Sequence, residues 1–375
     1  MHGAFLFAAK HKITPKYTPQ ESGVDMRVKL KSGYTFNSPI GLGPGLDTEG
    51  EGIDGLHDLG FGSVEVGSIT IDQQQPKKFF QPTLKINLLH NTVQQLTRRI
   101  TPSLQMLLAN LAKRQNDIRL GNSRPKSDQL LGVNIQANFE TQTSVPYLTH
   151  QDFQKSIKEL TDFCDYVTIN LCQDKKASGI KQYYYYDAAL DKLLKSVVQT
   201  RNRELGRLAA FEFEKVTEDI TDYTTSVQRY YQRNSIVSTL KPMMLFVQIR
   251  LDDLLSIKNE QLAEESAKKF LASLALKCKQ YQIDGIVIQD QDTSRQLKIL
   301  QWLRSYDQKR DLALVSVGGI RSGKDAIERV KAGADLVQIY TPLFTVGPSV
   351  VQQYNREMAE ILKSEGKTSI NQLRV

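Results

Sequence analysis

Two glycine-containing turns near the end of the chain have the composition of a phosphate-binding site. An apolar stretch at 312–317 runs into Gly318 and Gly319, and a helical stretch then leads through Gly333 to a second apolar stretch at 336–341. Strand, glycine turn, helix and strand in this order predict a βαβ unit with parallel strands. Glycine lets the backbone approach a ligand, and the unpaired amides of such a turn suit a phosphate. A tight loop without a ligand is the alternative that these glycines alone leave open.

The composition is typical of a soluble globular protein with a sizeable core. The 375 residues are 40% hydrophobic and 24% charged, and no apolar run reaches the ~18 residues that span a bilayer. The net charge of +8 comes from 49 basic and 41 acidic residues spread along the chain, which does not predict a nucleic-acid-binding surface. Cys164, Cys172 and Cys278 lack metal-binding spacing, so we expect reduced thiols and no metal site.

Apolar stretches of strand length alternate with helical stretches along the chain, which predicts an α/β fold of the (β/α)8 TIM-barrel type. The expected strands are 39–47, 61–70, 130–136, 166–171, 243–249, 285–288, 312–317 and 336–341. Expected helices include 49–60, 104–112, 153–164, 188–198, 261–279, 296–306 and 350–364. In this fold chemistry takes place at the carboxyl ends of the strands, which is where the glycine turn at 318–319 lies.

We expect the barrel to occupy residues 26–366, closed at its amino end by a hairpin that begins at 26–30. Residues 1–25 form a basic lead-in, whose composition suits either the end of a transit peptide or a plain basic N-terminus. The polar stretch 199–240 is predicted to be a helical insertion, and 367–375 form a C-terminal tail.

Several motifs, in this order, resemble the dihydroorotate dehydrogenase family. They are PIGLGPGLDTEGEGIDGLHDLGFGSVEVGSIT, LLGVNIQAN, YVTINL, VSVGGIRSGKDAIERVKAGADLVQIYT and a final GP. The likeness is greatest to the quinone-linked, membrane-associated class 2 form of mitochondria. It implies a barrel that binds FMN over its carboxyl-end mouth and oxidises dihydroorotate to orotate.

The resemblance assigns FMN-binding roles along the barrel. A glycine turn after strand seven and the turn after strand eight would hold the flavin phosphate, small residues after strand one would lie under the ring, and a serine and two asparagines would contact it. In this sequence the matching residues are Gly43, Gly45, Ser68, Asn134, Asn170, Gly318, Gly319, Tyr340 and Thr341. Arg321 is an additional cation where the family often has serine.

The reactive positions depart from the family pattern. Two lysines that would stabilise the negative charge of reduced FMN are replaced by Thr48 and Gln248, and losing such a donor costs ~10²–10³ in rate. The serine or cysteine that would take the substrate proton falls on Gln173, which is not a base at neutral pH. Cys172 precedes it by one residue, and a shifted loop would make this thiol the base. Otherwise Cys172 is a small buried thiol.

Residues that would hold the substrate are altered too. The family's N-T-T after strand six becomes Asp290-Gln291-Asp292, which predicts like-charge repulsion of an anionic substrate. The last asparagine of the loop after strand four becomes Lys175, and only the flanking Asn87 and Asn91 remain of a further substrate-binding segment.

These departures lead to two main hypotheses. The first is a catalytically inactive relative that serves as an accessory subunit of a mitochondrial inner-membrane complex, with peripheral membrane association and without a transmembrane segment. Its contact surfaces would be the 199–240 insertion and the tyrosine run at 183–186, because Tyr and Arg are favoured at interfaces. The alternative is an active FMN-dependent dehydrogenase of pyrimidine biosynthesis, and a third hypothesis is a protein that holds flavin without turnover.

Overall fold

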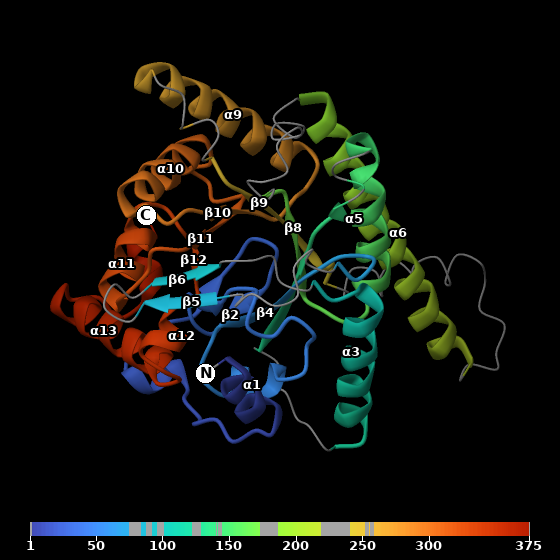
Figure 1. Cartoon of the computed structure of the whole chain (residues 1–375), viewed down its shortest axis with the longest axis horizontal. Helices are drawn as coiled ribbons and strands as arrows, with labels where there is room; N and C mark the ends of the chain where they lie inside the picture. The colour runs from blue at the N-terminus through green and yellow to red at the C-terminus, as the bar shows by residue number, and fades with distance from the viewer. Residues whose placement is uncertain are drawn as a thin grey trace.

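A computed structural model of the chain shows a closed barrel of eight parallel strands surrounded by helices (Figure 1). It describes residues 2–74, 84–87, 92–95, 101–121, 129–139, 141, 145–172, 187–218, 241–251, 255 and 259–374. The strands follow one another around the barrel in chain order: β3 (Ile40–Leu42), β4 (Ser63–Ile69), β7 (Leu130–Ile135), β8 (Tyr166–Asn170), β9 (Met244–Ile249), β10 (Gly285–Gln289), β11 (Ala313–Val317) and β12 (Leu336–Ile339). The predicted (β/α)8 fold is therefore confirmed.

The helices cover the outside of the barrel because the strands are buried on both faces. Each strand is a nearly continuous apolar run, as expected for a parallel sheet enclosed by helices. The covering helices are α2 (Ile53–His57), α3 (Leu104–Arg119), α5 (Thr149–Leu160), α6 (Asp187–Glu218), α9 (Glu260–Gln280), α10 (Thr293–Tyr306), α11 (Gly323–Lys331), α12 (Pro342–Thr345) and α13 (Val350–Ser364). Among the described residues, no helix is both long enough and apolar enough to cross a bilayer.

The predicted hairpin closes the amino end of the barrel. Strands β1 (Val28–Lys29) and β2 (Thr35–Phe36) pair antiparallel. The buried ring of Phe36 lies 6.3 Å from the ring of Tyr166 at the start of β8. Tyr166 also fills the space beside Gly132 on β7, where a Cβ would lie 2.0 Å from a ring carbon. Aromatic packing therefore seals this end.

The lead-in contains a helix that the sequence pattern does not indicate. Helix α1 (His2–Lys10) packs on α2, where a Cβ on Gly55 would lie 2.2 Å from the carbonyl oxygen of Ala9. The basic side chains of the lead-in pair with acidic residues of the following segment, as in Lys10 to Glu51 at 2.7 Å. The lead-in is thus held against the barrel by close backbone packing and by complementary charge.

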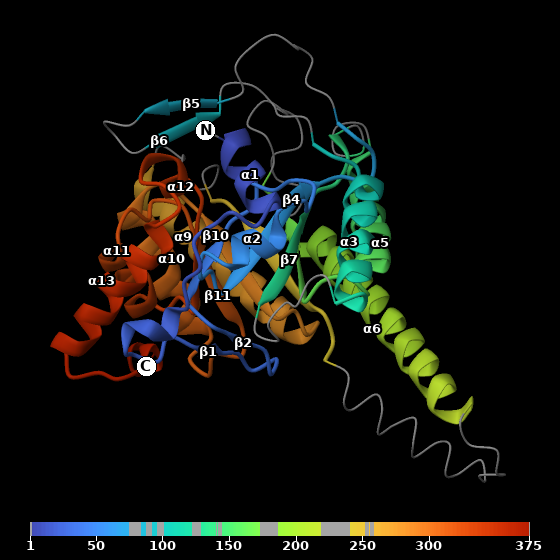
Figure 2. The same cartoon turned by 90° about the horizontal axis from the view of Figure 1, so that it is seen from below.

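Two further segments differ from the expected pattern. Helix α6 continues without a break past residue 199, and its buried Arg201 pairs with Asp284 at 3.1 Å. The remainder of the expected insertion, 219–240, and the tyrosine run at 183–186 lie outside the described residues. The stretch 71–100, which shows no clear period, holds the antiparallel strands β5 (Leu84–Asn87) and β6 (Thr92–Gln95). Figure 2 shows this pair on the side of the barrel where α12 lies.

Candidate active site at the carboxyl end of the barrel

The barrel brings the expected flavin-binding residues to one end. Parallel strands that close in chain order place all their carboxyl ends together, so the residues at or just after those ends face a common mouth. At this end lie Gly43 and Gly45 after β3, Ser68 in β4, Asn134 in β7, Asn170 in β8, Gly318 and Gly319 after β11, and Tyr340 and Thr341 after β12.

Asn134 is the centre of a hydrogen-bond network at this mouth. Its Nδ2 donates to Glu65 Oε1 and to Gln248 Oε1, both at 2.8 Å. Its Oδ1 accepts from Ser68 Oγ at 2.6 Å and from Asn170 Nδ2 at 3.1 Å. The side chain is fully buried, and its two N–H groups and both lone pairs are used. Two expected flavin-binding residues, Ser68 and Asn170, therefore both contact a third, Asn134, directly.

The network extends to three residues that sequence reasoning missed. Gln248 Nε2 donates to Gln289 Oε1 at 2.9 Å, and Gln338 Nε2 donates to Glu65 Oε2 at 2.6 Å. Gln338 Oε1 has no partner. The available signal was the presence of Glu65, Gln289 and Gln338 within otherwise apolar strands, because buried polar groups need hydrogen-bond partners.

The network carries one acidic group and no cation. Burial raises the pKa of Glu65, although hydrogen bonds from Asn134 and Gln338 partly oppose this. No described Lys or Arg forms an ion pair with Glu65. Gln248 stands where the resemblance implies a lysine, and both ends of its amide serve the network. Thr48, the other neutral replacement, is half-buried in the turn after β3.

The loop after β8 is described only at its beginning. The backbone amide of Cys172 donates to Asn170 Oδ1 at 2.9 Å, and its thiol is half-buried. Gln173 and Lys175 lie outside the described residues. The structure therefore places Cys172 beside the asparagine cluster, and its role as a base stays a prediction.

The glycine turn after β11 has the geometry of an anion-binding loop. Gly318 and Gly319 have φ values of 99° and 68°, in the left-handed region that favours glycine. The amides of Gly319 and Ile320 have no hydrogen-bond acceptor within the part of the chain that the structure describes. Successive free N–H groups in such a turn form a concave site for a phosphate. These residues fit the phosphate of FMN.

The carboxylates after β10 have partners within the protein. Asp290 accepts from Arg295 Nε at 2.5 Å and from Arg295 Nη2 at 2.6 Å, so its charge is offset. Asp292 is exposed and caps α10 by accepting from the backbone amide of Arg295 at 2.9 Å. The repulsion of an anionic substrate that we expected from these two residues is therefore smaller than their charges imply.

The other candidate residues are less informative. Asn87 is the last residue of β5, and Asn91 lies outside the described residues. The three cysteines form no disulfide. Within the described ranges, no group of three His, Cys, Asp or Glu side chains is arranged to hold a metal ion.

Comparison with known proteins gives a consistent result. The family model described as Dihydroorotate dehydrogenase matches residues 26–362. The chain is 28% identical to "Dihydroorotate dehydrogenase (quinone), mitochondrial" of Mus musculus, covering 96% of this chain and 81% of the relative. It is 27% identical to the protein of the same description from Lachancea kluyveri, covering 98% and 79%. "Dihydroorotate dehydrogenase (quinone)" of Polaromonas naphthalenivorans is 29% identical, covering 86% and 83%.

Solved structures share the fold. DHODH from Eimeria tenella in complex with ferulenol superposes with a TM-score of 0.74 at 22% identity, covering 99% of this chain and 93% of that chain. The ligand-free form of the same protein also gives 0.74, at 21% identity, covering 99% and 97%. Since the family model matches most of the sequence, this chain belongs to the dihydroorotate dehydrogenase family.

Proposed function

We propose that this protein is an FMN-dependent oxidoreductase of the dihydroorotate dehydrogenase type, acting on dihydroorotate or a less acidic relative of it. The observation that carries the proposal is the meeting of two features at one end of the barrel. One is the glycine turn with unpaired amides, and the other is the cluster of Ser68, Asn134 and Asn170. The names of the curated relatives support the same reaction.

The chain's own residues have distinct tasks in this proposal. FMN would supply the acceptor for the two electrons that leave the substrate as a hydride. The amides of Gly319 and Ile320 bind the phosphate, and the asparagine cluster orients the flavin ring. Oxidation also releases a proton from the carbon next to the hydride donor. Cys172 is the thiol that the described part of the loop after β8 offers to accept it.

Turnover is expected to be slow. At Gln248 and Thr48 a neutral side chain stands where the family resemblance implies a lysine, and removing one donor to a developing negative charge costs ~10²–10³ in rate. Gln248 already uses its amide within the network, which limits its ability to donate to a ligand.

The visible spectrum of the purified protein tests the proposal. We expect a flavin absorption band that bleaches when dihydroorotate is added without oxygen. The variant Asn134→Leu removes the centre of the hydrogen-bond network, so its spectrum should lack the flavin band. A coloured protein that never bleaches would show flavin binding without turnover, and a colourless protein would exclude the proposed reaction.

A second candidate function is that of a non-catalytic accessory subunit in a larger mitochondrial assembly. The network around Gln248 contains an acidic group, Glu65, but no cation among its described members, and this absence of a positive charge favours the alternative. A colourless protein that migrates with a large membrane complex on a native gel would support it, whereas migration as a free protein would contradict it.

We further propose a mitochondrial location with peripheral association at the inner membrane. The relatives from Mus musculus and Lachancea kluyveri are both described as mitochondrial, which supports the first part. Fractionation of mitochondria with a salt or carbonate wash tests both parts, since a peripheral protein is released by the wash.

A further inference from the structure

We propose that Arg329 is the charge-selecting residue beneath the Gly318–Gly319 turn, favouring a phosphorylated flavin over the same flavin without its phosphate. This inference rests on the proposed function and adds a residue that neither the motifs nor the family resemblance indicates. Arg329 lies on α11, and it acts on a ligand through the turn above it, without touching the ligand.

Arg329 is a fully buried cation without an ion pair. Its relative exposure is 0%, and no carboxylate among the described residues lies within 4.0 Å of its guanidinium. Its Nη1 donates to the carbonyl oxygen of Thr293 at 3.1 Å, and its Nη2 donates to Thr293 Oγ1 at 3.3 Å. Its Nε has no hydrogen-bond partner among the residues that the structure describes. A buried charge in this state is destabilising unless an opposite charge lies nearby.

The guanidinium lies directly against the glycine turn. A Cβ built on Gly319 would be 3.3 Å from Arg329 Nη2 and 3.3 Å from Thr293 Oγ1. A side chain at this position would therefore crowd both groups. The same turn presents the unpaired amides described above, so the cation lies next to the backbone that would hold the phosphate.

The neighbouring acidic residues have other partners. Asp290 is paired with Arg295, and Asp325 accepts from the backbone amide of Arg321 at 2.8 Å. Burial lowers the pKa of the Arg329 guanidinium, while the negative charges of Asp325, Glu328, Asp290 and Asp292 oppose this without forming an ion pair with it. The positive charge of Arg329 is thus only partly balanced by the protein.

A phosphate in the turn would balance that charge. A fixed cation a few ångströms behind the turn attracts a dianionic phosphate in a region of low dielectric constant, where the attraction is stronger than in water. The same cation has no corresponding effect on a flavin without phosphate. The arrangement therefore predicts selectivity for FMN over riboflavin, and it assigns that selectivity to charge more than to shape.

The test compares two flavins on variants of the full-length protein stripped of bound flavin. Binding of FMN and of riboflavin is followed by quenching of flavin fluorescence. We expect Arg329→Gln to weaken FMN binding about 10- to 100-fold and to change riboflavin binding by less than about threefold. Lys324→Gln is the matched control, because Lys324 is an exposed cation in the first turn of the same helix without a role in the site, and it should change neither affinity.

Three results would overturn the proposal. An equal loss of both affinities in Arg329→Gln would show that the residue only supports the fold. Unchanged FMN binding in that variant would show that its charge has no effect. A selective loss in Lys324→Gln without one in Arg329→Gln would show that charge anywhere on the helix, and not Arg329, affects FMN binding. If Arg329→Gln does not fold, Arg329→Lys replaces it. We then expect a smaller loss of FMN affinity with riboflavin unchanged, and equal losses count against the proposal.

A second probe separates this inference from the proposed function. If the wild-type protein binds neither flavin, FMN dependence fails, and glycerol phosphate is then tested as a simple phosphate monoester by thermal melting. Stabilisation of the wild type but not of Arg329→Gln would preserve the role of Arg329 towards another phosphorylated ligand. The absence of stabilisation in the wild type would overturn it. If FMN and riboflavin bind equally well to the wild type, the inference fails while flavin binding stands.

Discussion

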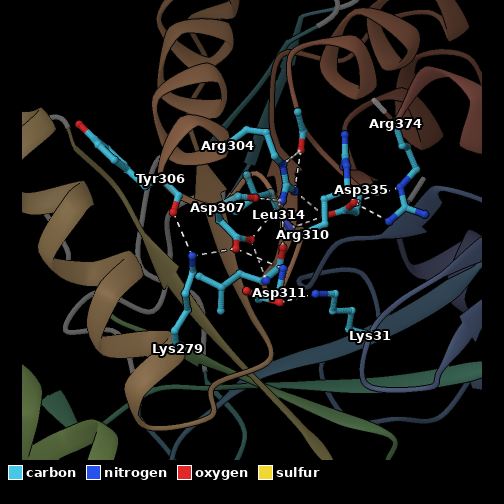
Figure 3. Close-up of polar contacts among 12 residues, drawn as sticks. Lys31, Lys279, Arg304, Tyr306, Asp307, Arg310, Asp311, Leu314, Asp335 and Arg374 are labelled. Atoms are coloured by element: carbon cyan, nitrogen blue, oxygen red, sulfur yellow. Dashed lines mark hydrogen bonds and ion pairs between the residues drawn. The ribbon is translucent and has the colours of Figure 1, made fainter.

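The two ends of the barrel hold their polar residues in opposite ways. At the amino end, three guanidinium groups converge on the buried carboxylate of Asp335 (Figure 3). Arg304 and Arg310 each donate to it at 2.7 Å, and Arg374 donates at 2.6 Å. Oδ2 also accepts the backbone amide of Leu314 at 2.8 Å. At the carboxyl end, the buried carboxylate of Glu65 accepts hydrogen bonds from the neutral side-chain amides of Asn134 and Gln338. The rest of that network consists of amides and the hydroxyl of Ser68.

This difference indicates a division of labour within one fold. The ion pairs at the amino end fix strands and helices together. At the carboxyl end, some polar groups have no hydrogen-bond partner among the described residues. They are Gln338 Oε1 and backbone amides in the glycine turn after β11. The same division is known for barrels of this type, in which one end serves stability and the other serves chemistry.

The largest expected effect follows from removing the shared carboxylate. Asp335→Asn leaves three buried or half-buried arginines without their common anion, so the free energy of unfolding should fall by about 3–5 kcal/mol. Urea denaturation at neutral pH measures this loss. The fraction that remains folded should bind FMN as the wild type does. Loss of flavin binding in folded Asp335→Asn protein would show that the amino end also supports ligand binding, which contradicts the proposed division between the two ends.

A smaller loss of stability is expected at the carboxyl end, together with a loss of ligand binding. Asn134→Leu leaves Glu65, Gln248, Ser68 and Asn170 without their central partner, at a cost of about 2–3 kcal/mol, and should abolish flavin binding.

Asn355→Leu is the matched control for Asn134→Leu. Asn355 is equally buried, but it bonds Ser38 and Val351, away from the mouth. It should therefore lower the melting temperature without affecting flavin binding. If both variants lose flavin equally, the asparagine cluster has no special role.

Glu65→Gln should change stability by about 1 kcal/mol, in a pH-dependent direction. A raised carboxyl pKa means that the folded protein holds the proton more tightly than the unfolded chain. The wild type should therefore lose stability as the pH rises from the ordinary value of 4.5 towards the folded value. Glu65→Gln lacks this loss, so between pH 4 and pH 8 the melting temperature of the variant should rise relative to that of the wild type. Parallel curves would show that Glu65 does not titrate in this window.

The smallest effect is expected from an exposed ion pair at the amino end. Lys31 and Asp311 are bonded and both are exposed, so Asp311→Asn should lower the free energy of unfolding by less than about 1 kcal/mol. Added salt should reduce the difference further, because exposed charges are screened. A loss comparable to that of Asp335→Asn would show that the amino end depends on its surface charges as well as on its buried ones.

Local patterns predicted much of the fold. Helix α13 was expected at 350–364 and is observed there, because its apolar stripe and the glycine before it are local signals. Helix α3 runs to Arg119, beyond the expected end at 112, since its last turns are polar and carry no stripe. The short strands β5 and β6 were missed for the same reason. Helix α1 was missed because its nine residues are mostly apolar and show no one-sided stripe.

The candidate site was predictable in its positions but not in its contacts. The glycine turn at 318–319 stood out because it follows an apolar strand, whereas Asn134 and Asn170 were assigned from the family resemblance. The bond between Glu65 and Gln338 joins residues 273 positions apart, and only closure of the barrel brings them together. The unpaired state of Arg329 is equally invisible in sequence, because it depends on which acidic residues other cations have already engaged.

In the hydrogen-bond network at the mouth, Glu65 determines which groups donate and which accept. A carboxylate can only accept, so Asn134 and Gln338 must both turn their amide nitrogens towards it. The side-chain oxygen of Asn134 then faces Ser68. The Ser68 hydroxyl donates its proton to that oxygen, so the hydroxyl lone pairs remain available to accept a hydrogen bond at the mouth. Protonation of Glu65 would free one amide to reverse. The pattern of donors and acceptors at the mouth is thus set by the ionisation of one buried carboxyl group.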